Sequence, residues 1–255
     1  MSTQPSRRLR TMLMTAALLV PLAATQAAPF GWLGGGDKVQ GSGHVSREAR
    51  QPGRFHGVAL AVGGNVEVRT GGDDAVTVEA DDNVLPLIET VVEDGVLQIR
   101  PTKKNVQLDP RHLKVTVQAR TIDSVDVAGS GNLTVDRMRG GKASLALAGS
   151  GSIDAGAVEA KSVSIEVAGS GKVRAAGAAD ALEVSLAGSG KADAAKLRAG
   201  RVEANVSGSG LATVLARQSL AAAITGSGSI GYYGDPQVSR AVMGSGTVQR
   251  LGDAR

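Results

Sequence analysis

The C-terminal half of the chain alternates apolar and polar residues on both sides of a repeated Gly-Ser-Gly tripeptide. Aliphatic or other small apolar residues stand three positions before and three positions after each serine, with mostly polar or small residues between them. Alternation with a period of two is typical of a strand with one buried face, so it predicts two short strands meeting at every tripeptide. The seven serines, spaced by 18 to 20 residues, are Ser130, Ser150, Ser170, Ser189, Ser209, Ser227 and Ser245.

A unit of about 20 residues cannot bury its own apolar face, so neighbouring units must stack on one another. We therefore predict an all-β fold, a parallel β-solenoid in which each unit is one coil and equivalent residues pair about 4.8 Å apart. An antiparallel β-sandwich, with each tripeptide as a hairpin turn, is the alternative. The solenoid is favoured because aligned columns pair with themselves without strain. Alanines five residues after the serine (Ala155, Ala175 and Ala194) predict a narrow interior.

The glycines of the tripeptide are expected at the corners between strands. A sharp corner often needs a positive φ, which glycine adopts without steric cost. A bulky residue at such a corner should therefore destabilise the coil. The predicted structural turns are Gly129, Gly131, Gly149, Gly151, Gly169, Gly171, Gly188, Gly190, Gly208, Gly210, Gly226, Gly228, Gly244 and Gly246.

Residues 55–120 carry a less regular β pattern. Residues 62–68 resemble a degraded repeat turn, and Glu93-Asp94-Gly95 has the composition of a hairpin turn. The segments with the composition and alternation of strands are 75–80, 96–99 and 113–117. We interpret the whole region as an irregular N-terminal β part of the same domain.

Two further regions flank this part. Residues 28–54 are predicted to form a connector and an N-terminal cap, with mobile connectors at 30–38 and 46–54. Residues 121–255 form the repeat solenoid and end in a cap. Pro236, Arg240 and Arg250 interrupt the apolar columns there, which suits a polar cap on an exposed sheet edge.

The first 27 residues have the three-part pattern of a secretory signal peptide. Arg7, Arg8 and Arg10 precede an apolar stretch at 11–22, and small residues follow at 25–27. The apolar stretch is too short to span a bilayer, and no longer one follows. The chain has no cysteine, hence no lipidation site at the cleavage point and no disulfide. We expect export to the periplasm or the cell exterior, with no membrane span after cleavage.

The charge of the chain argues against nucleic acid as a partner. The formal net charge is +4, and three of these charges lie in the predicted signal peptide, which leaves +1 for the mature chain. Positive and negative residues are interspersed along the rest of the sequence, so there is no basic footprint. Aromatic residues make up only 2 % of the chain, which again favours a thin, repetitive core.

Candidate catalytic and metal-binding residues are few. His44, His56 and His112 all lie outside the regular repeats, and none stands in a recognisable catalytic setting. A zinc site without cysteine would depend on carboxylates, which is uncommon. Asp73-Asp74 and Asp81-Asp82 could hold one calcium ion loosely, but exposed turn residues are the simpler interpretation. We expect no metal, no cofactor and no enzymatic activity.

Two outward-facing features are candidate binding residues. One is a column four residues after each serine, Thr134, Asp154, Arg174, Asp193 and Thr213, whose charged members change type from coil to coil as on a solvated face. A polysaccharide-acting enzyme is the alternative for this column, because a hydrolase needs paired carboxylates. The other feature is the pair Tyr232-Tyr233, for which end-capping is favoured over ligand binding.

The chain resembles the secreted bacterial proteins with a putative auto-transporter adhesin head domain, also called the GIN domain. The resemblance covers about 54–248. It rests on the run from Val76 to Ile88, followed by Val92-Glu93-Asp94-Gly95-Val96-Leu97, and on the Gly-Ser-Gly series. It implies an all-β, β-helix-like fold and an envelope location. It transfers no site residues.

Together these observations predict a non-enzymatic, exported envelope protein that presents a rigid β-repeat surface for adhesion or partner binding. An envelope protein or a cell-surface glycan is the expected partner, contacted through Asp154, Arg174 and Asp193 or through Tyr232 and Tyr233. A polysaccharide-acting enzyme and a structural or stress-related periplasmic protein are the alternatives. The oligomeric state stays open.

Overall fold

The structure, a computed structural model, describes residues 37–103 and 105–253. The predicted signal peptide at 1–27 and residues 28–36 of the predicted connector and cap at 28–54 lie outside the described residues. Most of the described residues are in strands, and there is one short 3-10 helix, which confirms the predicted all-β class. This part of the chain contains no helix that combines the length and the apolarity needed to cross a bilayer.

The strands in chain order are β1 (Asp37–Gln40), β2 (Val45–Arg50), β3 (Gly57–Leu60), β4 (Asn65–Thr70), β5 (Ala75–Asp81), β6 (Ile88–Glu93), β7 (Val96–Pro101), β8 (Val106–Asp109), β9 (Leu113–Ala119), β10 (Ser124–Gly129), β11 (Asn132–Gly149), β12 (Ser152–Gly169), β13 (Lys172–Gly188), β14 (Lys191–Gly208), β15 (Leu211–Gly226), β16 (Ser229–Tyr233), β17 (Gln237–Gly244) and β18 (Thr247–Gly252). The 3-10 helix η1 (Leu85–Leu87) lies between β5 and β6.

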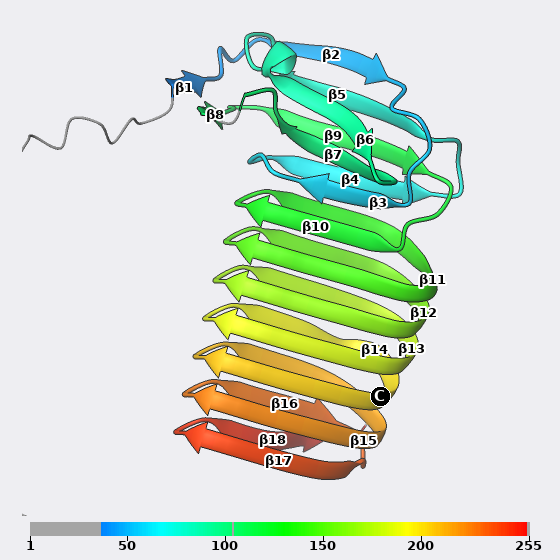
Figure 1. Cartoon of the computed structure of the whole chain (residues 1–255), viewed down its shortest axis with the longest axis vertical. Coiled ribbons are helices and arrows are strands. Elements are labelled where there is room, and N and C mark those ends of the chain that lie inside the picture. The colour runs from blue at the N-terminus through cyan, green and yellow to red at the C-terminus, as the bar shows by residue number, and fades with distance from the viewer. Residues whose placement is uncertain (1–36, 104, 254–255) are drawn as a thin grey trace, which may run out of the picture. The chain divides into compact units, whose positions relative to one another are not determined.

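Strands β11 to β15 are the coils of a parallel β-solenoid (Figure 1). Each one runs along one layer, bends, and returns along the other. The front sheet contains the C-terminal halves of these strands with β3, β10 and β17. The back sheet contains their N-terminal halves with β4, β16 and β18. The Gly-Ser-Gly corners form the turn edge, and the opposite side, residues 136–142 of β11 and their equivalents, forms the bend edge.

The coils stack in register, as predicted. Val127, Leu147 and Val167 are successive pairing partners in parallel ladders, and all three are buried. The antiparallel sandwich is therefore wrong for this part of the chain. Ala155 and Ala175 are pairing partners, and both are buried, as is Ala194, which fits the predicted narrow interior.

The two glycines of each corner are needed for different reasons. Gly149, the first of its pair, has a φ of +126°, which disfavours other residues. Gly151, the second, has no positive φ, but a Cβ there would collide with the carbonyl oxygen of Gly131 in the coil before it. Main-chain bonds connect consecutive corners, with the amides of Ser150 and Gly151 both donating to the Gly129 carbonyl at 2.9 and 3.0 Å.

The N-terminal part is a coil stack whose spatial order differs from the chain order. Strands β3 and β4 form a coil around the degraded turn at 62–65, and β10 and β11 pair with its C-terminal side. Strands β7 and β9 pair with its other side. The chain therefore passes the β3–β4 coil, forms the coil beyond it, and returns to continue at β10.

Antiparallel strands cover the N-terminal end of this stack. The β6–β7 hairpin closes the front layer, while β5 and β2 extend the back layer. The predicted turn between β6 and β7 is confirmed, because Asp94 and Gly95 both have positive φ, 52° and 78°, as a two-residue type I′ hairpin requires. The interpretation of 46–54 as a mobile connector is wrong for Val45–Arg50, which pairs with β5 as strand β2.

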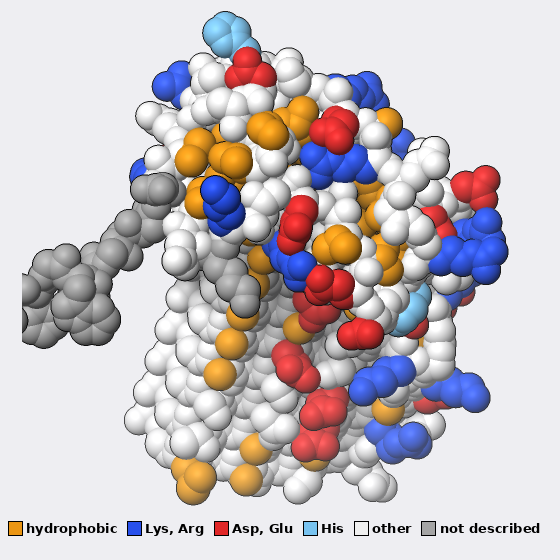
Figure 2. Space-filling model, turned by 45° about the horizontal axis from the view of Figure 1, so that its top comes forward, with side chains coloured by type: hydrophobic (Ala, Val, Ile, Leu, Met, Phe, Trp, Pro, Cys, Tyr) orange, Lys and Arg blue, Asp and Glu red, His pale blue; other side chains and the backbone are white. Residues whose placement is uncertain are grey.

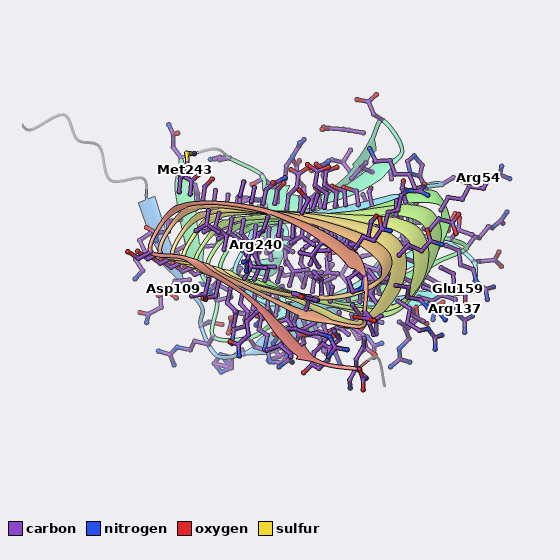
Figure 3. All side chains as sticks on the ribbon, turned by 90° about the horizontal axis from the view of Figure 1, so that it is seen from below. Arg54, Asp109, Arg137, Glu159, Arg240 and Met243 are labelled. Atoms are coloured by element: carbon purple, nitrogen blue, oxygen red, sulfur yellow. The ribbon has the colours of Figure 1, made fainter. Side chains whose placement is uncertain are left out.

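Charged residues occupy inward positions at the C-terminal end. Arg240 on β17 continues the column of Ala222, and Arg250 on β18 continues that of Tyr232. Figure 3 shows Arg240 between the two layers at this open end. Every residue of β17 is exposed. An inward-facing charge on an edge strand discourages further strand pairing, so this end has the character of a polar cap.

Candidate functional site

The charged column predicted from the sequence is assembled on the back sheet. Asp154, Arg174 and Asp193 are successive pairing partners on β12, β13 and β14. The Asp154 carboxylate lies 3.8 Å from an Arg174 guanidinium nitrogen, and both side chains are about half exposed. An exposed pair of this kind contributes little to stability. The charges in this column alternate in sign, as in a solvated ladder.

The two neighbouring tyrosines have different surroundings. Tyr232 continues the inward column of Val214 and packs on the hydrophobic core, so it closes the interior at the C-terminal end. Tyr233 pairs with Leu215 at the bend edge, where it lines a hollow of about 470 Å³ with Lys196 and Arg198. The end-capping interpretation therefore fits Tyr232, whereas Tyr233 lies at the bend edge and lines a hollow there.

A shallow groove of about 530 Å³ runs over the N-terminal coils of the front sheet near the turn edge. Its alanines include Ala128, Ala148, Ala168 and Ala187, which stand one residue before the first corner glycine in four consecutive coils. Figure 2 shows a line of hydrophobic side chains on this face and a line of acidic side chains beside it. A recurrent Ala before Gly-Ser-Gly is the sequence signal for this groove, although the repeat pattern alone does not predict the apolar floor of the groove.

Acidic residues border the groove, and no basic residue lies between them in the column of Asp126, Ala146 and Glu166. Asp126 and Glu166 flank Ala146 in one outward column, two coils apart. Partial burial, and after it the repulsion from Glu166, raise the pKa of Asp126 above its ordinary value. Both effects disfavour the ionised form of Asp126.

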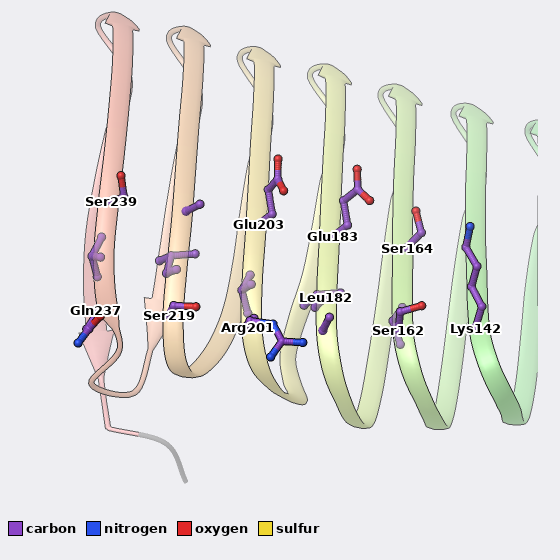
Figure 4. A pocket seen from close by; sticks show the side chains of 16 residues that line it. Lys142, Ser162, Ser164, Leu182, Glu183, Arg201, Glu203, Ser219, Gln237 and Ser239 are labelled. Atoms are coloured by element: carbon purple, nitrogen blue, oxygen red, sulfur yellow. The ribbon is translucent and has the colours of Figure 1, made fainter.

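A second groove of about 670 Å³ lies on the same sheet toward the bend edge and the C-terminus. Its side chains form straight rows across successive coils (Figure 4). Glu183 and Glu203 are neighbours in one row, and Lys142, Ser162 and Arg201 belong to another. Arg201 lines both this groove and a hollow on the bend edge, so it lies where the two meet.

The bend-edge hollow has a volume of about 980 Å³ and contains three arginines, Arg198, Arg201 and Arg217, with Asp180. It arises because β14 has 18 residues, whereas its neighbours β13 and β15 have 17 and 16. The columns on both layers stay in register, so the difference falls in the bends, where the ladders shift. The shorter spacings of the serines were the sequence signal for this hollow.

The acidic pairs considered for calcium are occupied by protein contacts. Asp81 is fully buried, and its carboxylate accepts main-chain N–H bonds from Gly43, Arg111 and His112 at 2.8 to 3.0 Å. The bond from His112 is the largest cause that lowers the pKa of Asp81. Asp73 pairs with Arg120. Among residues 37–103 and 105–253 there is no group of three His, Cys, Asp or Glu side chains placed to hold a metal.

The histidines are structural or exposed side chains in this arrangement. His56 lies 2.9 Å from Asp123 through Nδ1, and both side chains are largely exposed. His44 and His112 lie in loops, and their main-chain carbonyls accept hydrogen bonds from the amides of Asp82 and Asp81, respectively. The structure therefore brings no histidine of the described residues next to the Asp154–Arg174–Asp193 column.

Solved structures share this architecture. A putative adhesin from Bacteroides fragilis is 26 % identical, with a TM-score of 0.77 over 84 % of this chain and 100 % of that one. A putative lipid binding protein from Parabacteroides distasonis (24 % identity, TM-score 0.69, 84 % and 100 % covered) and a putative adhesin from Parabacteroides merdae (20 %, 0.66, 84 % and 99 %) share the fold. Comparison with curated proteins gave no match.

The sequence itself matches a family described as putative auto-transporter adhesin, head GIN domain. The match extends over residues 54–236, from the segment before β3 to the loop between β16 and β17. It therefore includes both the irregular N-terminal strands and the regular coils. The expected resemblance is confirmed, and this chain belongs to the putative auto-transporter adhesin head GIN domain family.

Proposed function

We propose that this protein is an exported, non-enzymatic envelope protein that presents a rigid β-repeat surface for adhesion or partner binding. One observation carries the proposal: the outward side chains of β11 to β15 stand in straight columns on main-chain ladders that pair nearly every residue of adjacent coils. Such a surface is organised before the partner arrives, so binding loses little conformational entropy.

The comparisons support the same proposal. The family carries an adhesin description, and the structure from Bacteroides fragilis is a putative adhesin with more than a quarter of its aligned residues identical. The predicted signal peptide would deliver the chain to the periplasm or the cell surface. An envelope protein or a cell-surface glycan is the partner that such a location offers.

The proposal is tested with the whole protein in its own cells. Deletion should reduce attachment of the cells to surfaces or to other cells, and the full-length chain supplied in trans should restore it. The exported protein, immobilised after purification, should retain an envelope component. Unchanged attachment after deletion, together with an empty pull-down, would contradict the binding role and favour a structural or stress-related one.

The enzymatic alternative gives a different result. A glycan-cleaving enzyme would release reducing ends from uronate or glucan polymers, and Asp154→Ala or Asp193→Ala would abolish that release. We expect no release by the unaltered protein, because Arg174 lies between these carboxylates in the same column. Polymer cleavage that depends on either aspartate would replace the proposal with a catalytic one.

A further inference from the structure

We propose that the bend-edge hollow of β13, β14 and β15 binds an anionic polysaccharide through Arg198, Arg201 and Arg217, with Tyr233 as the platform for a sugar ring. This inference rests on the proposed function and names the ligand class and its site. Carboxylate and sulfate groups on the sugar are the shared anionic chemistry that the arginines recognise.

The positive charge in this hollow is not neutralised by the protein. The arginine hollow contains three arginines and one acidic side chain, Asp180, and the adjoining Tyr233 hollow adds Lys196 and one acidic side chain, Asp253, which is paired with Arg250. Ion pairs do form elsewhere on this edge, such as Arg139 with Glu159 at 2.9 Å. Among the described residues, none of the ion pairs includes Arg198, Arg201 or Arg217.

The arginines have the chemistry for oxyanions. A guanidinium group presents planar, paired N–H donors that match carboxylate and sulfate oxygens, and a charge-assisted pair of this type is stronger than a neutral hydrogen bond. Arg198 and Arg217 come from adjacent coils, and Arg201 stands at the end of the β14 bend. Donors from two coils can therefore contact one extended chain at more than one sugar.

The aromatic residue of the site, Tyr233, lies in the same column as Arg198. Arg198, Leu215 and Tyr233 are successive partners in one column across β14, β15 and β16, about 4.8 Å apart from coil to coil. The hollow that contains Tyr233 shares Arg198 and Leu215 with the arginine hollow. Leu215 is only 2 % exposed, so the column has an apolar floor between the charge and the ring.

This combination favours a sugar acid over other anions. The apolar floor and the half-buried ring suit the C–H face of a pyranose, while the guanidinium groups suit its acidic substituent. A nucleic acid would need a longer basic groove with several stacking rings. Asp253, the other acidic residue near Tyr233, is already paired with Arg250 at 2.6 Å.

The test measures binding of the exported, full-length protein to immobilised polygalacturonate, dextran sulfate and neutral dextran. Arg198→Gln with Arg217→Gln should weaken binding to the preferred polyanion at least about tenfold. The matched variant, Lys172→Gln with Lys191→Gln, removes the same charge from the back sheet next to the turn edge and should change binding less than about twofold. Neutral dextran should not bind.

A second variant keeps every arginine. Ala178 is exposed, lines the hollow and pairs with Arg198, so Ala178→Glu should place a carboxylate beside the site and weaken polyanion binding, whereas Ala168→Glu on the front sheet should not. Tyr233→Leu should weaken binding while leaving the melting temperature near that of the unaltered protein. These variants decide the question even if the double arginine variant does not fold.

The outcomes separate the possible results. Preference for polygalacturonate or for dextran sulfate identifies the acid group, and both support the site. Equal losses in the hollow and matched variants, binding to neutral dextran, or binding only to vesicles of anionic phospholipid would overturn it. If attachment depends on the protein while the hollow variants bind polyanions normally, this inference fails and the proposed function stands. If the hollow binds polyanions, but deletion leaves attachment unchanged and the immobilised protein retains no envelope component, the proposed function fails instead.

Discussion

Arg240 is the pairing partner of Ala222, one coil beyond it in the same inward column, at the C-terminal end of the stack. Val184, Ala204 and Ala222 are buried in that column, whereas Arg240 is exposed at its end. The inward column thus changes from apolar residues to a charged residue at the last coil, and no further coil follows it among the described residues (Figure 3). A charge at this position limits the addition of another strand layer.

Replacing that charge should therefore expose an adhesive edge. We expect Arg240→Val to associate in a concentration-dependent manner. Val238 and Val242 on the same strand are already 40 % and 39 % exposed, so the variant would present an uninterrupted apolar row along β17. Light scattering coupled to size-exclusion chromatography measures this. Arg137→Val, which removes a charge from the exposed bend edge, is the control and should remain like the parent. Identical behaviour of the two variants would contradict the capping role.

The first glycine of each corner should tolerate no side chain. Gly169 has a φ of +119°, and a Cβ would press on the carbonyl of Gly149, so Gly169→Val should lower the free energy of unfolding by at least about 1 kcal/mol. Ala168→Val, one residue earlier and exposed in a strand, should be neutral or stabilising. Urea denaturation of both variants gives the comparison, and an unchanged midpoint for Gly169→Val would refute the corner assignment.

Asp81 should be the most costly carboxylate to remove. Asp81→Ala leaves the main-chain N–H groups of Gly43, Arg111 and His112 without their acceptor, which should cost about 2 kcal/mol or more. Chemical denaturation at neutral pH measures the loss. Asp154→Asn, which affects only an exposed ion pair, should cost less than about 1 kcal/mol.

The same aspartate should make stability depend on pH. Its folded-state pKa lies below the ordinary value of 3.8, so the folded protein holds the ionised form more tightly than the unfolded chain does. The stabilisation is therefore present above about 3.8 and disappears as the pH falls through the lower, folded-state pKa. Thermal unfolding of the parent between pH 5 and about pH 2 should show this loss, and Asp81→Asn should show less of it. Parallel curves for the two proteins would contradict the assignment.

Asp126 should respond in the opposite direction. Its pKa is raised by burial and by Glu166, so its ionisation on going to neutral pH disfavours the folded state. Glu166→Gln should lower the pKa of Asp126 and stabilise the protein slightly at neutral pH, by less than about 1 kcal/mol. Carboxyl chemical shifts followed through an acid titration report this pKa directly. A pKa of Asp126 that does not move would exclude the coupling.

The regular coils were predictable from sequence because their signal is local and repeated. Val127, Leu147 and Val167 stand at one offset from their serines, so periodicity alone aligned them. The reversed order of the β3–β4 and β7–β9 coils was not predictable, since it depends on pairing between segments far apart in the sequence. Strand β2 was missed because Val45–Arg50 has a mostly polar composition and gains its place by pairing with β5.

The candidate sites were only partly predictable for a related reason. The column of Asp154, Arg174 and Asp193 follows from a fixed offset within the repeat. The arginine hollow follows from differences in length between neighbouring coils, and those differences acquire a spatial meaning only when the bends are stacked. Tyr232 and Tyr233 are adjacent in sequence, yet alternation along the strand sends one to the core and the other to the bend edge.

The unequal lengths of β13, β14 and β15 also affect how this architecture can diversify. Because the additional or missing residues fall at one edge, a short insertion or deletion re-aims a few side chains while the hydrogen-bonded layers keep their alignment. Related chains could then change what they recognise through small changes in loop length, without repacking the interior. A single frame would in this way support many different specificities.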